Sequence, residues 1–125
     1  MNRKLLFKEI NELCLKLDSA YNINDGGCCF VAACIANQLE KYNIPFTVIH
    51  YNLWGCHYAI KVNDRYLNRC DYRKKEIGAE IKCNSSYIYD IYTSKDWNPR
   101  YDSKNNKTIE KYIIELFEKY ENCRT

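Results

Sequence analysis

A pair of glycines leads directly into a cysteine and an apolar run, in the stretch Asp25-Gly26-Gly27-Cys28-Cys29-Phe30-Val31-Ala32-Ala33-Cys34-Ile35. Apolar residues recur at helical spacing after Cys28, so a helix is predicted to begin near this residue. The N-terminus of a helix carries about half a positive charge, which favours a thiolate over a thiol. Because glycine permits a tight turn and a close approach of substrate, Cys28 is a candidate nucleophile. The alternative is that Cys28 and Cys29 are two small buried apolar residues at a helix start.

The size and charge of the chain limit the classes of function. Its 125 residues are predicted to form one domain, residues 1–125, with a modest core. The 19 basic and 16 acidic residues leave a net charge of +3, which is too small to indicate nucleic-acid binding. There is no apolar run of membrane-spanning length, and the first nine residues lack the apolar segment of a signal peptide. We therefore expect a cytoplasmic protein with reduced thiols that does not bind membranes.

The periodicity of the apolar residues predicts an α+β domain. Three helices are expected, over residues 3–18, 28–42 and 108–121. Three strands rich in β-branched and aromatic residues are expected, over residues 46–52, 56–62 and 65–71. Residues 80–92 contain many Ile and Tyr residues and fit either a strand or a helix. The second helix has apolar residues on more than one face, so we expect it to be central and mostly buried.

The two histidines of the chain, His50 and His57, both lie in predicted strands. If Asn63-Asp64 forms a two-residue hairpin turn, the residues that flank it face each other and fix the register of the two strands. His57 and Asn68 are then diagonal neighbours on one face of the hairpin, close enough for their side chains to meet. Asp71, the other polar candidate, would point to the opposite face unless the register slips. His50 is interpreted as a surface or hydrogen-bonded residue.

A thiol at a helix start, a histidine on a packed strand and a third polar residue form a set that suits nucleophilic catalysis. Cys28 would attack a carbonyl carbon, His57 would take up and return the proton, and Asn68 would orient the imidazole. This set resembles the papain-like cysteine protease superfamily, in the reduced form of transglutaminase-like and small phage or bacterial papain-fold proteins. The resemblance covers residues 22–72 and rests on Gly26-Gly27-Cys28, His57-Tyr58-Ala59-Ile60-Lys61-Val62 and Arg65-Tyr66-Leu67-Asn68. It implies a papain-like core, with the nucleophile helix packed on an antiparallel sheet.

Several residues around this set have more than one interpretation. In the family an aromatic residue commonly follows the nucleophile, which makes Cys29, followed by Phe30, the alternative to Cys28. Asn22 stands where papain-type enzymes have an oxyanion-hole amide, and the resemblance implies that role for it; the alternative is an ordinary loop asparagine. Trp54 precedes the histidine strand, where it would either line a substrate cleft or fill the core.

We therefore expect a hydrolase or acyl transferase that acts through its thiol on a peptide or isopeptide bond, with no cofactor and no metal. The eight cysteines lack the C-x₂-C pairs that structural zinc sites use. A protein or peptide is the expected partner, and the resemblance to phage proteins suggests a host protein. The alternative is a non-catalytic binding or inhibitor protein on the same scaffold, because the 12 tyrosines could form a binding face.

Overall fold

The computed structural model describes residues 1–24, 27–53, 55–70, 73–93 and 103–121. Its helices are α1 (Arg3–Tyr21), α2 (Cys28–Lys41), α3 (Ser85–Thr93) and α4 (Ser103–Glu121). Its strands are β1 (Thr47–Tyr51), β2 (His57–Val62), β3 (Arg65–Leu67) and β4 (Ala79–Ile81). These four helices and one antiparallel sheet, with strand order β3-β2-β1-β4, confirm the predicted α+β class.

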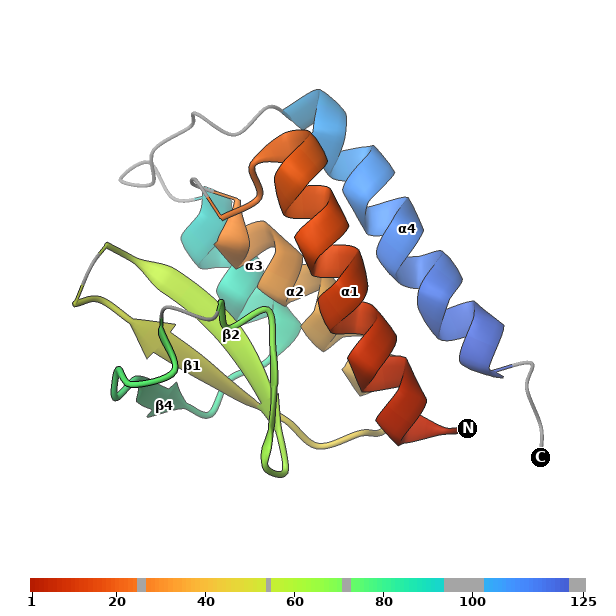
Figure 1. The fold of residues 1–125 in the computed structure, drawn as a ribbon, viewed down its shortest axis with the longest axis horizontal. Coiled ribbons are helices and arrows are strands. Elements are labelled where there is room, and N and C mark those ends of the chain that lie inside the picture. The colour runs from red at the N-terminus through yellow and green to blue at the C-terminus, as the bar shows by residue number, and fades with distance from the viewer. Residues whose placement is uncertain (25–26, 54, 71–72, 94–102, 122–125) are drawn as a thin grey trace.

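The helices lie together on one side of the sheet (Figure 1). α2 is central, because it packs against β2 and also contacts α3 and α4. α1 and α4 run alongside each other on the outer side of this helical layer. None of the described helices is long and apolar enough to cross a membrane.

The burial of α2 confirms that it is the central helix. Eleven of its 14 residues are buried, and it begins at Cys28 as the sequence predicts. It ends at Lys41, because Asn43 adopts a left-handed backbone with φ of 56° and Pro45 follows shortly after. Each large apolar side chain buried in this way contributes roughly 1.5–3 kcal/mol relative to exposure. The position of the first turn of α2 is therefore fixed by packing along the rest of the helix.

The hairpin formed by β2 and β3 has the predicted register. Val62 pairs with Arg65 across the turn, and Asn63 has the positive φ, 53°, that a two-residue turn of this kind requires. The third predicted strand is too long, since β3 ends at Leu67. It ends there because Asn68 also takes up a left-handed conformation, with φ of 59°, and leaves the strand ladder.

The two faces of the sheet have different surroundings. Tyr58 and Ile60 of β2 belong to the main core under the helices. Tyr51 and Ala59 belong to a second, smaller cluster on the other face. Because side chains alternate along a strand, His57 belongs to this second face, and its ring lies 6.3 Å from that of Tyr51.

Residues 80–92, left open between strand and helix, divide between the two. β4 covers only Ala79–Ile81 and pairs with β1, while α3 begins at Ser85. The backbone N–H and hydroxyl of Ser85 donate to the carboxylate of Glu40, at 2.6 and 2.8 Å, which ties the start of α3 to α2. α4 begins at Ser103, earlier than the predicted residue 108. Trp54 and Asp71 lie outside the described residues.

Candidate functional site

Cys28 is the first residue of α2, and its thiol is directed at the start of β2. The residue is 1% exposed, and its Sγ donates to the carbonyl oxygen of Cys56 at 3.9 Å. Burial raises the pKa of the Cys28 thiol to about 11, although the backbone N–H groups of Tyr58 and Cys29 oppose this shift. The backbone N–H groups at the helix start do favour the thiolate, as predicted, but desolvation outweighs them, so the resting thiol of Cys28 is protonated.

The neighbouring thiol of Cys29 is directed elsewhere. It is fully buried, and its Sγ lies 3.3 Å from the carbonyl oxygen of Ile88 in α3. Successive residues of a helix are rotated by about 100°, so the two adjacent thiols face different elements. Of the two candidates, Cys28 is the one that lies against the strand carrying His57.

His57 is the first residue of β2 and is 1% exposed. Its Nε2 lies 2.6 Å from the backbone carbonyl oxygen of Asn68 and donates to it, since a carbonyl oxygen can only accept. The acceptor of the neutral ring is therefore Nδ1. Burial lowers the pKa of His57, the Asn68 carbonyl opposes this shift, and the positive charge of Arg73 adds to it. The ring is thus neutral at pH 7 and carries its lone pair on Nδ1, which is the form that a general base requires.

Asn68 contacts His57 through its backbone carbonyl, whereas the hairpin register predicted that the two side chains would meet. Its side-chain amide pairs instead with Asn24, with Asn68 Nδ2 donating to Asn24 Oδ1 at 3.1 Å. Its backbone N–H donates to Oδ1 of Asn11 at 2.8 Å. The left-handed conformation of Asn68 and these two partners together hold its carbonyl against the imidazole. The hairpin register predicted Asn68 from the sequence, whereas nothing in the sequence indicated Asn11 and Asn24 as its partners.

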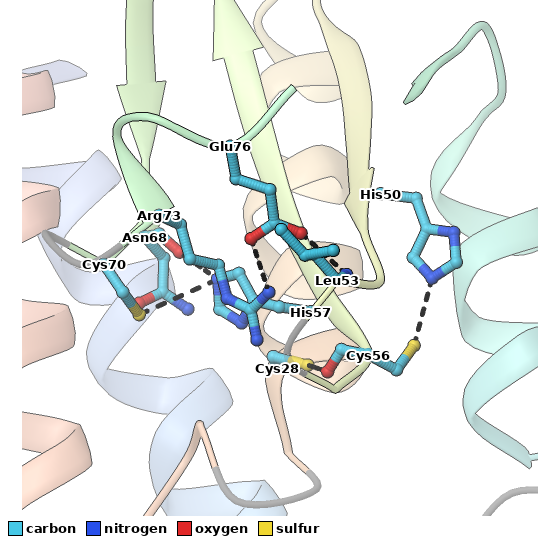
Figure 2. Close-up of polar contacts among 9 residues, drawn as sticks. All are labelled: Cys28, His50, Leu53, Cys56, His57, Asn68, Cys70, Arg73 and Glu76. Atoms are coloured by element: carbon cyan, nitrogen blue, oxygen red, sulfur yellow. Dashed lines mark hydrogen bonds and ion pairs between the residues drawn. The ribbon is translucent and has the colours of Figure 1, made fainter. Parts of the chain in front are cut away.

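Figure 2 shows Cys28 and His57 at the same end of β2. No hydrogen bond joins these two described residues, because the thiol bonds to Cys56 and the imidazole to Asn68. Sγ of Cys70 also lies 3.8 Å from Nε2 of His57. The candidate nucleophile and the candidate base thus lie at the same end of β2. The contact to Asn68 uses Nε2 of the ring and not Nδ1.

A buried ion pair lies over this strand end. Arg73 Nη1 is 3.0 Å from Glu76 Oε2, and both side chains are only 3% exposed. The other carboxylate oxygen of Glu76 accepts from the backbone N–H of Leu53 at 2.8 Å (Figure 2). The guanidinium also lies 5.9 Å from the centre of the Tyr51 ring. The pair therefore ties the segment after β3 to the segment before β2 and places a positive charge near His57. The i,i+3 spacing of Arg73 and Glu76 was the available sequence signal.

A groove of about 710 Å³ adjoins this site between α1 and the hairpin, and it includes Asn68. Most of the residues that line it have polar side chains, with Asn22, Asn24 and Arg69 among them. Asn22 is the exposed C-cap of α1, and its backbone N–H donates to the carbonyl of Asp18 at 2.8 Å. The structure therefore places Asn22 at the groove, hydrogen-bonded to α1, and no hydrogen bond within the described residues joins it to Cys28.

The cysteines of the described part of the chain are free thiols, at Cys14, Cys28, Cys29, Cys34, Cys56, Cys70 and Cys83. Within the same described ranges, no group of three or more Cys, His, Asp or Glu side chains is arranged to hold a metal ion. Comparisons with protein-family models, with curated proteins and with solved structures found no match to this chain.

Proposed function

We propose that this protein is a thiol-dependent hydrolase or acyl transferase that acts on a peptide or isopeptide bond, built on a papain-like core. The proposal is supported by a thiol at the first residue of a buried helix and a neutral imidazole at the first residue of the strand it faces. The observation that carries it is the 2.6 Å hydrogen bond from His57 Nε2 to the Asn68 carbonyl. This bond fixes the tautomer in which Nδ1 accepts a proton.

In the proposed reaction, His57 Nδ1 takes the thiol proton of Cys28 while Sγ attacks the carbonyl carbon of the substrate. The tetrahedral intermediate then collapses to a thioester on Cys28, and the imidazolium gives its proton to the leaving amine. Water or a second amine attacks the thioester, with His57 again acting as the base, which gives hydrolysis or transfer. A buried thiol with a raised pKa suits a mechanism in which proton transfer accompanies attack.

The groove beside Asn68 is the proposed binding site for a protein or peptide substrate. Its volume, about 710 Å³, falls within the range of ordinary ligand sites. Its amide-rich lining offers both donors and acceptors, which suits the backbone of a peptide. The oxyanion role of Asn22, the cleft role of Trp54 and a host protein as the natural substrate stay predictions.

A second candidate is a non-catalytic binding protein on the same scaffold. It is favoured by the state of Cys28, which is 1% exposed, has a pKa of about 11 and makes no hydrogen bond to His57. A protein of this kind would use the groove beside Asn68 to hold its partner and would have no need of the thiol.

Peptide turnover separates the two candidates. The protein is incubated with a mixed peptide library in heavy-oxygen water with an added primary amine, and products are identified by mass spectrometry. We expect heavy-oxygen carboxyl termini or amine adducts with the wild-type protein and with the matched control His50→Gln, and none with Cys28→Ala or His57→Gln. Products that persist in Cys28→Ala would exclude the proposed enzyme. Peptide retention without products, equal in wild type and Cys28→Ala, would favour the binding protein.

A further inference from the structure

A second thiol–imidazole pair lies on the other side of Cys56 from the proposed catalytic residues. The thiol of Cys56 is exposed, and its Sγ is 3.1 Å from Nε2 of His50. Figure 2 shows that the carbonyl of Cys56 is directed at Cys28, whereas its thiol is directed at His50. Cys56 therefore contacts the buried thiol of Cys28 through its backbone carbonyl, and the imidazole of His50 through its own exposed thiol.

The sheet builds this second pair. His50 of β1 and Tyr58 of β2 are opposite each other in the strand register, and their rings stack at 4.5 Å with an angle of 13° between planes. The Tyr58 hydroxyl also hydrogen-bonds to the sulfur of Cys56. Two neighbouring strands thus direct one imidazole and one phenol at the same exposed thiol.

The resting pair consists of a neutral imidazole and a neutral thiol. Burial lowers the pKa of His50, and the positive charge of Arg73 lowers it further. Burial raises the pKa of the Cys56 thiol, while the Tyr58 hydroxyl and Arg73 oppose that shift. A neutral imidazole in contact with a thiol can accept its proton as the sulfur attacks, which is how a general base activates a nucleophile.

We propose that Cys56 and His50 form a covalent modification site for α,β-unsaturated carbonyl compounds. In this reaction Sγ of Cys56 bonds to the β-carbon as the S–H proton passes to His50 Nε2. The electron pair of the C=C double bond moves to the α-carbon, which then takes that proton from the imidazolium. The addition needs no oxidant and expels no leaving group. It rests on residues other than those of the proposed function.

Exposure distinguishes Cys56 from the other thiols of the described residues. Cys56 is exposed, whereas Cys70 and Cys83 are only partly exposed and the remaining four are buried. Cys83 serves as the internal reference, because it is partly exposed and burial likewise raises its pKa. Cys70 also lies near a histidine, with its Sγ 3.8 Å from His57 Nε2, but that nitrogen donates its proton to the Asn68 carbonyl and so cannot accept one from the thiol. Among the thiols of the described residues, Cys56 is the exposed one, and it lies 3.1 Å from the imidazole of His50.

Residue-resolved labelling with acrylamide tests the proposal. We expect Cys56 to form its adduct about a hundredfold faster than Cys83, since a positioned general base gives rate gains of this order. His50→Gln should bring Cys56 down to the rate of Cys83, whereas His57→Gln should leave its rate unchanged. Free imidazole in solution should restore part of the rate in His50→Ala, which a merely structural role of His50 does not predict. Equal rates for Cys56 and Cys83 in the wild type, or an unchanged rate in folded His50→Gln, would overturn the proposal.

Two further variants keep the test decisive. If His50→Gln fails to fold, Tyr58→Phe preserves the stacked ring and removes the hydroxyl, and we expect it to slow the labelling of Cys56 by a few-fold. An unchanged rate in that variant would count against the site. Cys56→Ser should remove the fast adduct while leaving any turnover that depends on Cys28, so failure of this proposal and of the proposed function are distinguishable.

Discussion

The variants Asn68→Gly and Asn68→Ala separate the backbone role of Asn68 from that of its side chain. Both lose the amide pair with Asn24, which contributes about 1 kcal/mol to stability. The φ of this residue is 59°, a conformation in which alanine is less favourable than glycine by about 1 kcal/mol. We therefore expect the free energy of unfolding to fall by about 1 kcal/mol in Asn68→Gly and by about 2 kcal/mol in Asn68→Ala.

The same pair tests how His57 is oriented. Urea unfolding gives the two free energies, and nitrogen NMR of the histidine ring gives the tautomer. Because the 2.6 Å hydrogen bond uses the backbone carbonyl, Asn68→Gly should keep the Nε2–H tautomer of His57 and any turnover that depends on Cys28. A folded Asn68→Gly protein that loses this tautomer would show that the side chain, and not the backbone carbonyl, orients His57.

Two other predictions concern the groups around His57. The folded pKa of His57 lies below its ordinary value of 6.5, so its contribution to stability is complete above pH 6.5 and is lost as the pH falls below it. Wild type should accordingly lose up to about 1.4 kcal/mol per pH unit more than His57→Gln in this range, as measured by urea unfolding at several pH values, and parallel curves would contradict this. Arg73→Met should lower the free energy of unfolding by about 3–5 kcal/mol because it leaves the buried Glu76 carboxylate without its cation. The double variant Arg73→Met/Glu76→Met should recover much of this loss in the same urea assay. A smaller loss of unfolding free energy in Arg73→Met than in the double variant would contradict the proposed role of the ion pair.

Local patterns in the sequence were enough to predict the elements that position the site. Helical spacing after Gly27 placed the start of α2 at Cys28, and the Asn63-Asp64 turn fixed the register of the hairpin that brings Asn68 to His57. These features depend on residues close together in the chain, so their turn residues and periodicity can be recognised from the sequence alone.

The remaining features of the site depend on long-range packing. The amide pair of Asn24 and Asn68 joins residues 44 positions apart, so no local sequence pattern predicts it. The pKa of Cys28 follows from how completely β2 and α2 bury its thiol, whereas its place at a helix start suggested the opposite shift. Residues 80–92 were ambiguous because the Ile and Tyr residues of the nine-residue helix α3 also suit a strand, and a strand of three residues is too short to show a period of its own.

The site of acylation shows whether Cys28 is the nucleophile and His57 its base. The variant Cys56→Ser, which lacks the exposed thiol, is mixed with p-nitrophenyl acetate and quenched in acid, and the acetylated residue is mapped by mass spectrometry. The account predicts an acetyl thioester on Cys28 that is absent in Cys28→Ala and forms about a hundredfold more slowly when His57→Gln is added. Acetylation spread evenly over the remaining thiols, or a rate on Cys28 that His57→Gln leaves unchanged, would contradict it.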